Sequence, residues 1–174
     1  VLQIRTLILS AIKDLDYRLS FYIGGRARTT DVYPQKLLNI QLIKFDSLNF
    51  YRDLITFQPV NRNAFELTYK VGTKEIQKKF AYNQPVSIGN MAFSIKYPGE
   101  ISRKSTFIFK FNIPEDFVGR VRGGLRTSEI VRNSNIISLQ ETDYNPQFAA
   151  DILNAIMKEY LNYDKNQKTQ SATQ

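Results

Sequence analysis

The chain contains no cysteine, no histidine and no tryptophan among its 174 residues. Without cysteine it has neither a disulfide framework nor a thiolate nucleophile. Because histidine is missing as well, the sequence excludes a structural zinc site and the Ser-His and Cys-His catalytic pairs. Any enzyme built on this chain would have to work with carboxylates alone. We therefore expect a non-catalytic protein, with no catalytic residue, no bound cofactor and no metal ion.

Long hydrophobic runs are also missing. No stretch of eighteen apolar residues occurs, so we expect no part of this chain to span a bilayer. The opening VLQIRTLILS lacks the basic leader and the small-residue cleavage site of a signal peptide. The chain starts at Val1 and ends in the polar stretch NQKTQSATQ, which we interpret as boundaries inside a longer protein. Hydrophobic residues make up 43% and charged residues 23%, a balance typical of a globular domain.

Positive charge is in excess, with a formal net charge of +8. The excess is spread over the first three quarters of the chain, which favours a solvated, moderately basic surface. A groove for a polyanion is the alternative, and acidic polysaccharide or lipid headgroups would suit it as well as nucleic acid. The densest basic cluster consists of Arg120, Arg122 and Arg126, alongside Arg26 and Arg28. These five arginines are our candidates for subunit or polymer contact, against a purely solvated face.

The periodicity of apolar residues predicts an α+β fold. Residues Ile4 to Leu15 repeat at helical spacing, whereas the middle of the chain alternates with the period of strands and is rich in aromatic residues. The segment Phe80 to Gly89 contains Asn, Pro and Gly and is predicted to be a connection. We predict strands over Leu15–Ile23, Leu38–Phe45, Phe50–Phe57, Phe65–Tyr69, Met91–Tyr97, Thr106–Phe111, Leu125–Val131 and Asn135–Gln140.

Two further helices are predicted after the central strands. Pro114 suits the first turn of a short helix that stops near Gly123 and Gly124. Asn145 is a good N-cap before Pro146 and a sustained apolar stripe. Hardly any strand pair leaves room for a helical crossover, so the sheet is expected to be largely antiparallel. The predicted fold is thus α+β, with this sheet packed with an N-terminal helix, a short middle helix and a long C-terminal helix.

Three constellations resemble chemical motifs, and each has a simpler structural interpretation. Residues 119–124 read G-R-V-R-G-G, but no Lys-Ser/Thr pair follows, so a helix end is favoured over a phosphate-binding loop. The neighbours Glu115 and Asp116 are interpreted as partners of a helix dipole rather than as catalytic carboxylates. Glu141 and Asp143 form a poor calcium site and are assigned to a turn before a helix cap.

The aromatic residues divide into core positions and candidates for ligand contact. The residues at alternating positions that we predict to be core are Tyr17, Phe21, Phe93, Phe107 and Phe109. Tyrosines such as Tyr22, Tyr33 or Tyr163 could instead be exposed and stack on sugar rings, although nothing in their spacing selects them.

Four segments together resemble a known family. The opening L-Q-I-R-T-L-I-L-S-A-I-K-D-L-D-Y-R-L-S-F-Y, residues 2–22, resembles the segment after the first membrane helix of Wzc-like tyrosine autokinases. The stretch G-R-A-R-T-T-D-V-Y-P, residues 25–34, resembles the Bacteroides-type branch. The motifs R-T-S-E at 126–129 and S-N-I-I-S-L at 134–139 resemble the family's strands. Residues 145–160, with their N-P cap and A-x-x-I-L-N-x-I pattern, resemble its helix.

The resemblance implies that residues 1–163 are the periplasmic domain of a polysaccharide co-polymerase, followed by a polar tail, 164–174, that begins a longer helix. Such proteins act in the chain-length control, assembly and export of capsular polysaccharide or exopolysaccharide. The family implies self-association, partners in the polymerase and export machinery, contact with the glycan itself, no nucleic acid, and membrane helices on both sides of this domain. Its kinase would lie in a separate cytoplasmic segment. The runner-up interpretation is a polyanion-binding module without a membrane tether.

Overall fold

The computed structural model describes residues 4–24, 27–129 and 136–173. The chain forms two compact units. The first, which we call the β unit, is the continuous segment Arg18–Asn112. The second, the helical unit, is built from the residues before and after that segment. The predicted α+β class, with three helices and antiparallel sheets, is confirmed.

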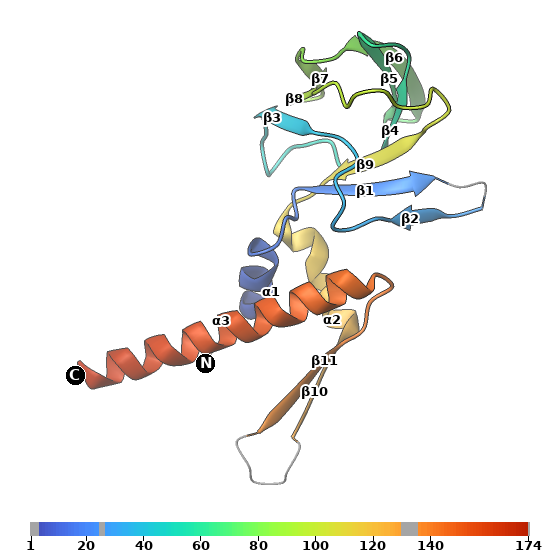
Figure 1. The fold of residues 1–174 in the computed structure, drawn as a ribbon. Coiled ribbons are helices and arrows are strands. Elements are labelled where there is room, and N and C mark those ends of the chain that lie inside the picture. Colours follow the sequence, from blue (N-terminus) through green and yellow to red (C-terminus); the bar gives the residue numbers. More distant parts are fainter. Residues whose placement is uncertain (1–3, 25–26, 130–135, 174) are drawn as a thin grey trace. The chain divides into compact units, whose positions relative to one another are not determined.

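The β unit contains a six-stranded and a three-stranded sheet, and all strand pairs in both sheets are antiparallel (Figure 1). The larger sheet has the order β2-β1-β9-β4-β5-β6 and the smaller one the order β3-β8-β7. The strands are β1 (Leu19–Gly24), β2 (Thr29–Asp31), β3 (Ile40–Lys44), β4 (Ile55–Pro59), β5 (Ala64–Val71), β6 (Lys74–Ala81), β7 (Val86–Ile88), β8 (Met91–Ile95) and β9 (Phe107–Phe111).

The two sheets of the β unit share an aromatic core. Phe93 of the smaller sheet is fully buried, and its ring centroid lies 5.9 Å from that of Phe109 and 5.2 Å from that of Phe111 in the larger sheet. Strand alternation places these rings on the inner faces, because successive side chains point to opposite sides of a strand. Phe21 is also buried, so the predicted core positions Phe21, Phe93 and Phe109 are confirmed. Tyr17 and Phe107, which were predicted to be core as well, are only half-buried.

The first and last strands of the β unit pair with one another, which brings its two ends together. β1 and β9 align with Phe21 opposite Phe109. At their ends, the backbone N–H of Asn112 donates to the carbonyl of Arg18 over 2.9 Å, and Arg18 Nη1 donates to the carbonyl of Asn112 over 3.1 Å. The buried Asn112 amide also donates to Ser20 Oγ over 2.8 Å. The β unit is therefore an insertion whose entry and exit are joined by hydrogen bonds.

The helical unit combines elements from both ends of the chain. Helix α1 packs against α3 and α2, and the hairpin of β10 and β11 contacts α2 and α3 through β11. The buried faces of α1 and α3 carry aliphatic and aromatic residues at three- and four-residue spacing, as the sequence predicts. The elements are α1 (Ile4–Lys13), the 3₁₀-helix η1 (Pro114–Phe117), α2 (Val118–Gly124), β10 (Leu125–Glu129), β11 (Ile137–Glu141) and α3 (Pro146–Ala172).

Four predictions about the strands were wrong. The strand predicted over Leu15–Ile23 begins only at Leu19. Lys74–Ala81 was assigned no strand, yet it forms β6, whose residues are mostly exposed because it is the edge of the larger sheet. Val86–Ile88 lies in the predicted connection but forms β7, a strand of three residues with two buried side chains. The strand predicted over Phe50–Phe57 begins only at Ile55.

Among the described residues, no helix combines the length and the apolar character needed to cross a membrane.

Candidate functional site

Polar and charged side chains gather in the helical unit where α2, β11 and α3 meet. We call this cluster the junction and define it by Arg120, Glu141, Asp143, Tyr144 and Asn145. Asp143 and Asn145 lie in the short turn that links β11 to α3, whereas Arg120 comes from α2. In the junction the carboxyl pKa of Glu141 is raised to about 7 and that of Asp143 is lowered. Shifted pKa values are common at functional sites and in structural ion-pair networks alike.

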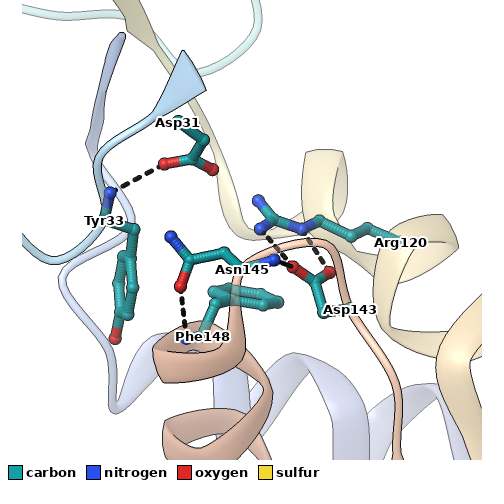
Figure 2. Close-up of polar contacts among 6 residues, drawn as sticks. All are labelled: Asp31, Tyr33, Arg120, Asp143, Asn145 and Phe148. Carbon is teal, nitrogen blue, oxygen red and sulfur yellow. Dashed lines mark hydrogen bonds and ion pairs between the residues drawn. The ribbon is translucent and has the colours of Figure 1, made fainter. Parts of the chain in front are cut away.

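The centre of the junction is an ion pair between Arg120 and Asp143 (Figure 2). Arg120 Nε donates to Asp143 Oδ2 and Arg120 Nη2 donates to Asp143 Oδ1, each over 2.7 Å. The Asp143 side chain is 2% exposed and that of Arg120 is 17% exposed. Such a two-pronged, charge-assisted contact is stronger and more directional than a single hydrogen bond. It ties α2 to the start of α3.

Aromatic rings hold the Arg120 guanidinium in place. Its central carbon lies 3.9 Å from the ring centroid of Phe148 in α3 and 4.3 Å from that of Tyr144. The face of an aromatic ring attracts a cation, and the attraction grows when water is excluded. Phe148 also stacks on Phe117, with the centroids 5.9 Å apart. Arg120 is thus part of the packed interior rather than a solvated cation.

The turn before α3 is closed by two short-range hydrogen bonds (Figure 2). The Asn145 side-chain oxygen accepts the backbone N–H of Phe148 over 2.9 Å, as expected of an N-cap. Asp143 Oδ1 accepts the backbone N–H of Asn145 over 2.8 Å. Burial by itself would raise the pKa of Asp143, but the hydrogen bonds from Arg120 and Asn145 and the charge of Arg120 outweigh it. The pKa of this carboxyl is therefore lowered.

Glu141, at the end of β11, has the opposite environment. Both of its carboxylate oxygens are buried, and no described residue forms a hydrogen bond with either of them. Burial raises the pKa of Glu141 to about 7, and the negative charge of Asp143 acts in the same direction, whereas Arg120 and Arg126 lower it. The carboxyl of Glu141 therefore exchanges its proton close to neutral pH.

Gly124, the last residue of α2, explains how the Glu141 carboxylate comes to lie so close to the backbone. A Cβ at Gly124 would lie 1.9 Å from the carbonyl oxygen of Thr142 and 2.6 Å from Glu141 Oε1. The backbone N–H of Thr142 donates to the Gly124 carbonyl over 3.1 Å. Only glycine allows this approach between the end of α2 and the end of β11.

A shallow depression of about 430 Å³ opens beside the ion pair. Its rim carries Arg126, which is exposed, and Tyr144, which is 71% exposed. Arg126 Nη1 donates to the carbonyls of Gly123 and Leu125 over 3.3 and 2.9 Å. Its fixed guanidinium beside an aromatic ring offers a contact point for an anionic or polar group.

The five candidate arginines do not form one site. Arg120 is engaged in the interior of the helical unit, whereas Arg122 and Arg126 of the same unit are exposed. Arg28 is exposed in the β unit. Arg26 lies outside the described residues. Of the three arginines of the densest cluster, two thus remain available at the surface for a partner.

The other motifs take the structural roles that were favoured. Residues 119–124 lie in α2 and include its end. Asp116 Oδ2 accepts the backbone N–H of Ile113 over 2.9 Å at the start of η1, and Glu115 is exposed in the same first turn. The described residues include no group of three acidic side chains placed to hold a metal ion.

Sequence reasoning missed the unusual carboxyl of Glu141, which was assigned to a turn. Its only signal is that Glu141 follows Ile137 and Leu139 at a spacing of two, so all three side chains point to the same face of β11. The tyrosines Tyr22 and Tyr163, considered as exposed, are half-buried.

Comparison of the chain with protein-family models and with curated proteins finds no match.

Proposed function

We propose that this chain is the extracytoplasmic domain of a bacterial polysaccharide co-polymerase, held on the periplasmic side of the inner membrane by the rest of a longer protein. The domain itself is non-catalytic. It acts in chain-length control, assembly and export of capsular polysaccharide or exopolysaccharide. The parent protein would self-associate and contact the polymerase and export machinery, and any tyrosine kinase activity would reside in a separate cytoplasmic domain.

One observation carries the proposal: segments of the resemblance that are far apart in the sequence fold into one unit. Helix α1 comes from the opening motif, β10 and β11 from the two strand motifs, and α3 from the helix motif. Helix α1 packs on α3, and Lys158 Nζ of α3 lies 3.8 Å from Asp14 Oδ2. The β unit is inserted between these segments and includes the end of the opening motif and the motif at 25–34; its part from Leu37 to Phe111 was recognised only by general character. This agreement supports a common domain plan.

The order of the elements also suits a domain tethered at both ends. The chain leaves the helical unit after α1, completes the whole β unit, and returns through η1 and α2 to the same helical unit. A tether before α1 and another after α3 would therefore both act on one unit. The β unit would then have no tether of its own, and its two ends are joined by the backbone hydrogen bond between Arg18 and Asn112.

The first test is the sequence of the gene on both sides of this segment. Apolar segments of about twenty residues on each flank are expected, because that length spans a bilayer as a helix. A phosphate-binding loop further downstream would make the parent a kinase. Soluble flanks without a membrane segment would overturn the proposal.

The second test is genetic. Deleting the codons for residues 18–111 in the full gene, with Asn112 kept as the joining residue, removes almost all of the β unit and keeps the proposed tethers. We expect the length distribution of the surface polysaccharide on a gel to shift or the polymer to be lost. The unaltered gene, carried in the same strain in the same way, is the control. An unchanged length distribution in the deletion strain, with the protein present in membranes, would contradict the proposal.

The runner-up, an untethered polyanion-binding module, is favoured by the exposed Arg122 and Arg126. It predicts tight binding of a fluorescent oligonucleotide with a steep dependence on salt concentration. The co-polymerase proposal predicts no such binding.

A further inference from the structure

The β unit contains a groove that none of the sequence motifs indicates. It has a volume of about 260 Å³ and lies between the loop after β4, the end of β6 and the segment after β8. That volume is slightly below the range of pockets for drug-sized ligands, so it suits a group of the size of one monosaccharide. The loops that form it are shaped by local hydrogen bonds: Asn61 Oδ1 accepts the backbone N–H groups of Asn63 and Ala64 over 2.8 and 2.9 Å.

Two tyrosines line the groove. Tyr82 and Tyr97 meet edge to face, with their ring centroids 5.2 Å apart. Tyr82 is only 7% exposed, and its ring centroid lies 4.9 Å from that of Phe65 and 6.4 Å from that of Phe57. The Tyr82 ring is therefore already held in place by the core of the β unit. Little side-chain conformational entropy is lost from it when a ligand binds. Tyr97 is half-buried and leaves part of its ring accessible.

The Tyr82 hydroxyl is a polar atom without a role in the fold. Within the described part of the chain it forms no hydrogen bond, and it is not one of the buried side-chain atoms, so it is accessible from the groove. Burial raises the pKa of Tyr82, and Tyr97 adds to the effect. The hydroxyl therefore stays protonated and can donate to a ligand in the groove.

The groove also carries two arginines and one carboxylate. Arg62 and Glu100 form an ion pair, and their side chains are 78% and 79% exposed. An exposed pair of this kind contributes little to stability, so it can open toward a ligand at low cost. Arg103 is exposed as well, and its backbone carbonyl accepts a hydrogen bond from Gln58 Nε2 over 3.4 Å. Two arginines beside two tyrosines suit a carboxylate ligand, because a guanidinium group can bind a carboxylate through two parallel hydrogen bonds.

We propose that this groove binds one carboxylate-bearing sugar residue of an acidic polysaccharide. The apolar face of the sugar ring packs on Tyr97, Arg62 and Arg103 donate to its carboxylate, and Glu100 accepts from a ring hydroxyl. The groove by itself selects a small anionic group with an apolar face. The choice of a sugar rests on the function proposed above.

The test is titration of the purified 174-residue chain with a trimer of galacturonic acid, followed by amide chemical shifts in NMR spectra. We expect shifts confined to the groove residues and a dissociation constant on the order of 1 mM, as for a ligand group of this size. The neutral trimer of galactose should bind at least about tenfold more weakly, because it lacks the carboxylate. Inorganic phosphate is the third probe.

Matched variants separate the groove from general charge. Arg103→Gln and Lys104→Gln each remove one positive charge from neighbouring exposed positions, but only Arg103 lines the groove. Arg103→Gln should weaken binding of the acidic trimer about tenfold, since hydrogen bonds to charged groups are the strong ones. Lys104→Gln should change it less than about twofold. Tyr97→Leu, which keeps an apolar side chain, tests the ring contact and should weaken both trimers.

Several results would overturn the inference. They are shifts outside the groove, equal binding of the acidic and neutral trimers, equal effects of Arg103→Gln and Lys104→Gln, or phosphate binding as tight as that of the acidic trimer. These outcomes leave the co-polymerase proposal standing, because that proposal depends on the flanking membrane segments and the polymer length. Soluble flanks would overturn the co-polymerase proposal without removing a measured groove affinity.

Discussion

The guanidinium of Arg120 and the carboxylate of Asp143 face each other in two parallel hydrogen bonds of 2.7 Å. The contact spans 23 positions of the sequence and joins α2 to the turn before α3. It therefore fixes the relative position of the elements that form the junction. The two partners are nearly out of contact with water, so removing one of them leaves a buried, uncompensated charge.

Arg120→Ala should destabilise the helical unit by about 3 kcal/mol, at the low end for a broken buried ion pair because Arg120 keeps some exposure. Arg120→Lys should recover only part of this loss, since an ammonium group cannot make the two-pronged contact. All helices in the described part of the chain belong to the helical unit, so urea unfolding followed by the helical circular dichroism signal measures the effect. Arg122→Ala is the control, because Arg122 lies two positions further along α2 and is exposed. Its free energy of unfolding should stay within about 0.5 kcal/mol of that of the original chain. Equal effects of Arg120→Ala and Arg122→Ala would contradict the structural role of the ion pair.

Substitutions at the adjacent glycines Gly123 and Gly124 of α2 test the close approach between α2 and β11. Gly124→Ala places a methyl group 1.9 Å from the Thr142 carbonyl oxygen, so the end of α2 and the end of β11 must separate. We expect a loss of about 2 kcal/mol or more. A Cβ at Gly123 meets nothing within 4 Å, and alanine is the better helix former, so Gly123→Ala should raise stability by up to about 1 kcal/mol. Thermal unfolding of the two variants should give midpoints displaced in opposite directions, and a shift of the same sign in both would show that the close approach does not constrain the fold.

The stability of the helical unit should fall as the pH rises toward neutral, because of Glu141. Its pKa in the folded chain is about 7, above the value of 4.5 for a free glutamate. Between these two values the folded state holds a proton that the unfolded state has released, so the stabilisation present below pH 4.5 is lost as the pH rises through about 7. The chain has no histidine, so no imidazole titrates in this window.

Glu141→Gln removes this titration and keeps the shape of the side chain. The stability of Glu141→Gln relative to the original chain should increase by roughly 1–2 kcal/mol from pH 5 to pH 8, after allowance for partial screening by water. Urea unfolding at both pH values gives this difference, and the carboxyl carbon signal of Glu141 in NMR gives the titration midpoint directly. A midpoint near that of a free glutamate would refute the assignment.

Asn145 supplies the N-cap of the longest helix. Asn145→Ala removes the acceptor for the Phe148 N–H and should cost about 1 kcal/mol. Asn145→Asp keeps an acceptor and adds a negative charge at the positive end of the helix dipole, so most of the stability should remain. Asn154→Ala, at an exposed position inside α3, should be neutral or slightly stabilising because alanine favours helix. If Asn145→Ala behaves like Asn154→Ala in thermal unfolding, the cap contributes nothing.

Much of the fold follows from local patterns. The helical spacing of apolar residues from Ile4 onward and the N-P pair at 145–146 placed α1 and the start of α3, and the alternation in Met91–Ile95 and Phe107–Phe111 placed β8 and β9. These predictions succeed because each pattern needs only neighbours in sequence and one buried face. The edge strand β6 escaped prediction because lysines interrupt its one partly apolar face, which carries only Ile76 and Phe80, and only its pairing with β5 makes it a strand.

The sequence by itself determined the class of fold, the absence of thiol and imidazole chemistry, and the caps and turns that depend on adjacent residues. Only the tertiary structure decided which charges matter. Arg120 is half-buried and Arg122 is exposed, although they are two positions apart, because α2 turns one toward Asp143 and the other toward water. Likewise, no local pattern distinguishes Glu141 from a solvated glutamate or joins Tyr82 to Tyr97 in a groove. Burial and charge interactions are summed over neighbours in space, and those neighbours are set by the packing of distant segments.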